Sequence, residues 1–122
     1  MNKIILLIIF IVLNFSSLVF ASEKEEALES VGIYCDELPT LKSISKEIEQ
    51  VKQIKGKSGY PDYVKLRHLD SQYYIVNEDI KERQQIYKSY FGKNLNPSVC
   101  KNRKYYDSEL KKIRNQLLIE EK

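Results

Sequence analysis

Residues 96–120, NPSVCKNRKYYDSELKKIRNQLLIE, form the stretch on which the predicted fold depends. Its apolar side chains are spaced three, four or seven residues apart, which places them on one side of an α-helix. Asn96 is a suitable N-cap, and Pro97 fits the first helical position, where a missing N–H costs nothing. The sequence therefore predicts a helix from Asn96 to about Glu120. Its apolar stripe consists of Val99, Tyr106, Leu110, Ile113 and Leu117.

The two cysteines link this helix to the other end of the chain. Cys100 lies in the first helical turn, and the only other cysteine, Cys35, lies far upstream. In an oxidising compartment, two cysteines predict one disulfide, Cys35–Cys100, and the alternatives are two free thiols or an intermolecular pair. Closing so long a loop is worth about 4 kcal/mol in the chain-entropy model.

The N-terminus has the layout of a secretory signal peptide. A lysine is followed by an unbroken apolar run over residues 4–13, and small residues precede a cut after Ala21. We therefore expect residues 1–21 to be removed and residues 22–122 to form a single helical domain in the periplasm or outside the cell. An uncleaved membrane anchor is the alternative. The polar Asn14 and the acidic residues after Ser22 argue against it.

Cleavage would leave 101 residues, with 19 basic and 17 acidic side chains. This length fits one domain with a modest core. A net charge of +2 is too small to indicate nucleic-acid binding, and export argues against it independently.

We expect an all-α fold, a small bundle of four or five helices closed by the disulfide. The first helix covers Ser22–Tyr34, and Cys35–Pro39 is a connector because proline disfavours helix in the preceding residue. The second helix begins at the cap Thr40 and reaches about Ile54.

The region from Asp62 to Phe91 has neither glycine nor proline and is predicted as one helix, or as two that meet near Asn77. Gly92 ends it. The apolar stripes together predict the core. It consists of Leu28, Val31, Leu41, Ile44, Ile48, Val51, Leu66, Leu69, Tyr73, Ile80, Leu110, Ile113 and Leu117.

Chemistry-bearing residues are few. His68 is the only histidine, so a catalytic role would require Asp70 or a tyrosine as its helper. The cysteines lack metal-ligand spacing, and adjacent carboxylates on a helix diverge. We therefore predict no catalytic residue, no metal and no cofactor.

Tyrosine is the unusual feature. Residues 22–122 contain nine tyrosines and one phenylalanine, with doublets at 73–74 and 105–106. Neighbours on a helix point about 100° apart, so one of each pair faces outward, and we expect these to be Tyr74 and Tyr105. Tyrosine and arginine are favoured where proteins bind proteins, although tyrosine also fills half-buried cores. The predicted partner-binding residues are Tyr74, Arg83, Tyr87, Arg103 and Tyr105.

These observations favour an exported protein-binding module whose partner is another exported protein, such as a toxin, a hydrolase or a client. It would act as an inhibitor, an immunity protein or a chaperone. Its format is similar to that of exported immunity proteins and small acid-stress chaperones, although no motif supports membership of either group. The alternative is a peripheral protein that binds anionic lipid, and an enzyme ranks third. The basic residues that would face lipid are Lys52, Lys55, Lys57, Lys101, Arg103, Lys104, Lys111, Lys112 and Arg114.

Overall fold

The computed structural model describes residues 2–54, 56 and 59–120, and it describes side chains between residues 22 and 118. The predicted signal peptide, residues 1–21, therefore lies outside the described side chains. The elements in chain order are α1 (Asn2–Gln53), α2 (Tyr63–Phe91), the 3-10 helix η1 (Pro97–Asn102) and α3 (Arg103–Glu120). The described residues contain no strand, which confirms the all-α class. The expected number of four or five helices is wrong, because three α-helices are present there.

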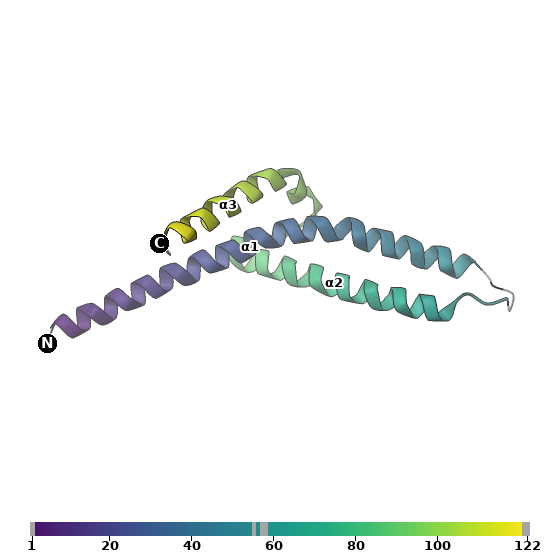
Figure 1. The fold of residues 1–122 in the computed structure, drawn as a ribbon, viewed down its shortest axis with the longest axis horizontal. Coiled ribbons are helices and arrows are strands. Elements are labelled where there is room, and N and C mark those ends of the chain that lie inside the picture. The colour runs from purple at the N-terminus through teal and green to yellow at the C-terminus, as the bar shows by residue number, and fades with distance from the viewer. Residues whose placement is uncertain (1, 55, 57–58, 121–122) are drawn as a thin grey trace.

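Helices α1 and α2 form a long antiparallel hairpin, and α3 folds back along α1 (Figure 1). Both α2 and α3 pack on α1, which is therefore the central element. Beyond the start of α3, the hairpin continues as two helices alone (Figure 1). We call the part that contains α3 the base and the two-helix part the arm.

The predicted connector Cys35–Pro39 is helical, and α1 passes through it without a break. Pro39 cannot donate to the carbonyl of Cys35, and a proline inside a helix costs about 3 kcal/mol. The helix persists because Cys35, Leu38 and Leu41 pack against the core on both sides of the proline. The axis of α1 bends near its middle (Figure 1), as expected for an internal proline. Thr40 is not a cap, and its hydroxyl instead donates to the carbonyl of Asp36.

Helix α2 is one helix, so the proposed break near Asn77 is absent. It begins at the N-cap Asp62, whose carboxylate accepts from the backbone N–H of Lys65 at 3.1 Å. It ends at Gly92, which has a φ of 71° and donates to the carbonyl of Lys88, so the predicted stop is confirmed.

The last predicted helix is divided into two parts. Asn96 is an N-cap, because its side chain accepts from the backbone N–H of Ser98 at 3.1 Å. The chain then forms η1, and α-helix begins only at Arg103. Short 3-10 segments are common at helix starts. Here the turn is constrained at both ends, because Leu95 is buried in the core and Cys100 is bonded to α1.

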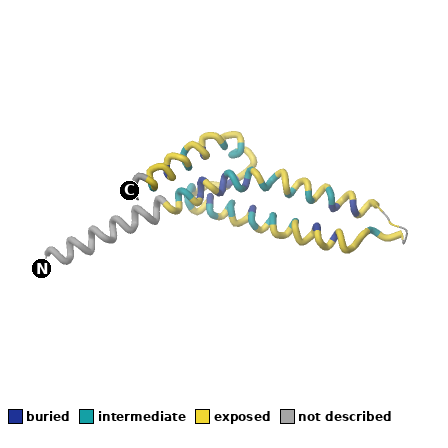
Figure 2. Tube along the Cα trace, viewed as in Figure 1, coloured by how far each residue is buried: buried dark blue, intermediate teal, exposed yellow. Residues whose placement is uncertain are grey.

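The core has two clusters, one in the base and one in the arm, and Figure 2 shows buried positions in both parts of the hairpin. Every predicted core residue is buried or half-buried. The predicted core left out four other buried residues, Ala27, Tyr34, Tyr87 and Leu95, and it also left out Tyr106, although Tyr106 lies on the predicted apolar stripe of the last helix. The base cluster consists of Leu28, Val31, Tyr34, Ile80, Tyr87, Leu95, Tyr106 and Ile113. The arm cluster consists of Ile48, Val51, Leu66 and Leu69.

The predicted disulfide is confirmed. Cys35 of α1 and Cys100 of η1 are bonded, with 5.7 Å between their Cα atoms and 65 residues between them in sequence. A disulfide of this kind indicates an oxidising compartment, such as the periplasm or the extracellular space. None of the helices in the described part of the chain has a stretch both long and apolar enough to span a bilayer.

Candidate functional site: an apolar groove beside the disulfide

An apolar groove of about 1060 Å³ lies on the described surface. It lies along one side of α1 and starts at the disulfide. Tyr73 of α2 and Pro97 of η1 contribute to its walls. From α1 it is lined by Cys35, Leu38, Pro39, Leu41, Lys42, Ser45, Lys46 and Glu49.

The groove begins where α3 stops covering α1. Arg103, the first residue of α3, forms two guanidinium–carboxylate hydrogen bonds to Asp36. Near the other end of α3, Arg114 contacts Glu25 at 3.1 Å and Glu29 at 3.4 Å. These pairs hold α3 against residues 25–36 of α1. The turns of α1 that follow Asp36 are not covered by α3, so Leu38 and Leu41 are only half-buried.

The rim of the groove is basic. Lys42 and Lys46 are exposed and lie one helical turn apart. Neither belongs to an ion pair within the described residues, whereas Glu49 pairs with Lys52 at 3.8 Å. The groove therefore combines an apolar floor with two positive charges that have no carboxylate partner among the side chains the structure describes.

Two of the predicted partner-binding tyrosines are on the surface as expected. Tyr74 is 65% exposed and Tyr105 is 62% exposed, while their neighbours Tyr73 and Tyr106 face inward. They lie on different helices, α2 and α3, and neither lines the apolar groove. The doublet analysis thus gave the correct orientations, but the structure does not bring these tyrosines to the groove.

Tyr87 is a correction, because its side chain is fully buried and offers no surface to a partner. Its hydroxyl lies 3.1 Å from that of Tyr106, and its ring packs on Phe91 with 4.6 Å between centroids. Burial first, and then the hydrogen bond with Tyr106, raise the pKa of the Tyr87 hydroxyl. A tyrosine can enter a core when its hydroxyl has a partner, and here a second tyrosine is that partner.

The two predicted arginines serve intramolecular contacts. Arg103 holds α3 to α1, and its hydrogen bonds keep the pKa of the Asp36 carboxyl below the ordinary value. Arg83 is mostly covered and lies 3.5 Å from Asp79 on α2. Arg103 and Arg114 were also among the basic residues expected to face lipid, and both form ion pairs with acidic residues of α1 instead.

A cluster of charged groups lies where α1 and α2 meet, near the groove but outside its lining. Glu37 has a buried carboxylate oxygen without a hydrogen-bond partner among the described groups. Burial, followed by interaction with the nearby Asp79, raises the pKa of the Glu37 carboxyl to about 7, and Arg83 opposes this shift. Two carboxyls can share a hydrogen bond only when one carries a proton. The packing of α1 on α2 around Glu37 and Asp79 is thus expected to change in stability with pH.

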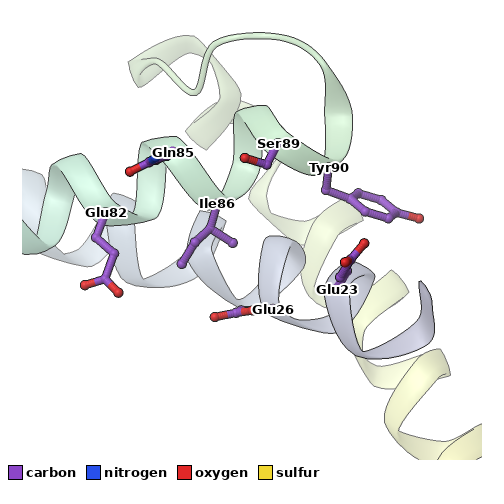
Figure 3. A pocket seen from close by; sticks show the side chains of 7 residues that line it. All are labelled: Glu23, Glu26, Glu82, Gln85, Ile86, Ser89 and Tyr90. Carbon is purple, nitrogen blue, oxygen red and sulfur yellow. The ribbon is translucent and has the colours of Figure 1, made fainter. Parts of the chain in front are cut away.

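A second recess lies at the base and is acidic. Figure 3 shows Glu23 and Glu26 on α1 facing a row of α2 side chains that includes Glu82 and Tyr90. Its volume is about 440 Å³. Within the described side chains there is no group of three or more residues placed to hold a metal ion. Three glutamates make this recess acidic: Glu23, Glu26 and Glu82.

Sequence reasoning missed the groove, although its residues give a signal. Cys35, Pro39, Lys42, Lys46 and Glu49 recur every three or four positions, a helical stripe that becomes visible only when α1 is continuous through Pro39. The predicted connector interrupted that stripe. Leu41, which was assigned to the core, packs against the base cluster and also lines the groove.

Comparison of the chain with protein-family models, with curated proteins and with solved structures finds no match.

Proposed function

We propose that this chain is an exported helical module that binds another exported protein and inhibits, shields or chaperones it. The observation that supports this proposal best is the apolar groove beside the disulfide. Ligand and peptide sites in proteins are concave and mostly apolar with a few polar groups. The groove has this composition, and its volume is more than twice that of the acidic recess.

Its surroundings suit a docking surface. The disulfide joins η1 to α1 at one end of the groove, so that end is held in place by a covalent bond. A preorganised surface loses less conformational freedom on binding, which favours affinity. The disulfide also fits an exported location, where a secreted or periplasmic partner would be met.

The test is co-purification from the exported fraction of the native host. The protein is expressed from its full-length coding sequence with a C-terminal tag, so that native processing takes place. We expect one stoichiometric protein partner. Ser45 lines the groove and is exposed, so Ser45→Arg should fill the groove and lose this partner. Ser43 is also exposed on α1 and does not line the groove, so Ser43→Arg is the matched control.

The absence of any stoichiometric partner for the wild-type protein would contradict the proposed function. Retention of the partner by Ser45→Arg would place the interaction elsewhere on the surface. Thermal unfolding of both variants shows that they are folded.

A further inference from the structure

We infer that the groove takes one amphipathic α-helix of about four turns with acidic residues along its flanks. This inference rests on the proposed function, because it names the chemistry of the partner segment that the groove receives.

The first argument is geometric. The groove-lining positions Cys35, Pro39, Lys42, Lys46 and Glu49 recur at alternating intervals of four and three residues, so they form one stripe along α1, which we call the seam. A second helix can lie along such a stripe, where it would cover the half-buried Leu38 and Leu41 beside it. The seam spans 15 residues of α1, from Cys35 to Glu49, so it is about 20 Å long, or about four helical turns. Its length matches that of a single helix of about four turns lying along α1.

The second argument is the continuity of packing. In the base, α1 packs on both α2 and α3, which gives three-helix packing. In the arm, α2 is the only helix that covers α1. At the junction, Leu38 and Leu41 are half-buried at the edge of the base cluster and Tyr73 is half-buried at the edge of the arm cluster, and all three line the groove. A helix that starts near Pro97 and runs along the arm would extend the three-helix packing over these side chains.

The third argument is charge. The seam carries Lys42 and Lys46, which have no ion-pair partner among the described side chains, and the charge of Glu49 is offset by Lys52. An occupant with glutamate or aspartate beside its apolar stripe would complement these lysines, as in the flanking ion pairs of coiled coils. A basic helix would meet two like charges, which disfavours it. The segment α3 of a second copy is such a helix, because it carries Lys104, Lys111 and Lys112.

The probes are two fluorescently labelled 14-residue helical peptides with the same apolar stripe. One has glutamate at every flanking position, and the other has lysine there. Fluorescence anisotropy measures their binding to the purified, oxidised protein at low and moderate salt. We expect the acidic peptide to bind at least about tenfold more tightly, with a preference that weakens as salt screens the charges.

Charge-reversal variants test whether the preference arises at the groove. Lys42→Glu combined with Lys46→Glu should remove or reverse it. Lys93→Glu combined with Lys104→Glu changes the net charge equally at exposed positions outside the groove, and should preserve it.

Equal binding of the two peptides would overturn the inference, as would a preference that survives the Lys42 and Lys46 reversals. Flotation with anionic vesicles, combined with no binding of either peptide, would also overturn it and favour a lipid ligand. Dimerisation that Ser45→Arg abolishes would show that a second copy occupies the groove. If Ser45→Arg loses the co-purified partner but the acidic peptide has no advantage, the proposed function stands and this inference fails.

Discussion

The base and the arm of the hairpin share the same two long helices but differ in what covers them. In the base, α1 lies between α2 and α3, and the disulfide holds η1 against it. In the arm, α1 and α2 pack only on each other around four buried residues. The same kind of apolar stripe therefore produces a closed core in one half and leaves an open groove in the other. Coverage by a third helix decides which side chains remain available to a partner.

The largest expected effect concerns the bond that closes the base. Cys35→Ser and Cys100→Ser should each reduce the free energy of unfolding by about 4 kcal/mol, because either change frees the same loop. The double variant should add little to either single one. Thermal and denaturant unfolding measure this. If the double variant lost the sum of the two single losses, the disulfide alone would not account for the effects of the single changes.

A matched pair of leucines compares the two cores directly. Leu28 in the base is 2% exposed and Leu69 in the arm is 4% exposed. We expect Leu28→Ala to cost about 3 kcal/mol and Leu69→Ala about 2 kcal/mol, because two helices close over a gap more easily than a site held from three sides. Denaturant unfolding gives both values. A larger loss for Leu69→Ala would mean that the arm is packed as rigidly as the base.

The pH dependence of stability tests the junction between the regions. The pKa of Glu37 is about 7 in the folded chain, above its ordinary value of 4.5. The stabilisation from protonated Glu37 is therefore present at low pH and is lost as the pH rises through 7. Between about pH 5 and about pH 8, the free energy of unfolding of the wild type should fall by about 1–2 kcal/mol more than that of Glu37→Gln. Glu82→Gln, on an exposed part of α2, is the control and should follow the wild type.

The smallest effect belongs to the buried tyrosine pair in the base. Tyr87→Phe removes one partner of the hydroxyl contact with Tyr106 and should cost about 1 kcal/mol. Tyr74→Phe, at an exposed position of α2, should change stability by less than about 0.5 kcal/mol. Equal effects of the two changes would show that the buried contact contributes nothing measurable.

The sequence was most informative where local chemistry determines structure. Helical periodicity, the cap at Asn96, the stop at Gly92 and the cysteine pair each depend on residues close in sequence or on simple counting, and each is present in the structure. The helix count failed at Pro39, because packing against the core carries α1 through the predicted connector. At Asn77 the sequence left one helix or two open, and the structure has one. Tyr87 was placed on the surface because its hydroxyl partner, Tyr106, lies 19 residues away and is not apparent from periodicity. The groove exists because α3 covers only the base of α1, from Arg103 onward, and no local sequence pattern shows how much of α1 another helix covers.

The position of the disulfide has a consequence for proteolysis. The connection between α1 and α2 lies inside the segment that the Cys35–Cys100 bond encloses, and Gly59 and Tyr60 there are exposed. A protease that cuts at this exposed tip would leave two polypeptides joined by the sulfur bridge, each still contributing a long helix to the hairpin. The cut protein would migrate as one species on a non-reducing gel and as two after reduction. An exported protein that meets proteases could be nicked in this way and still keep its groove.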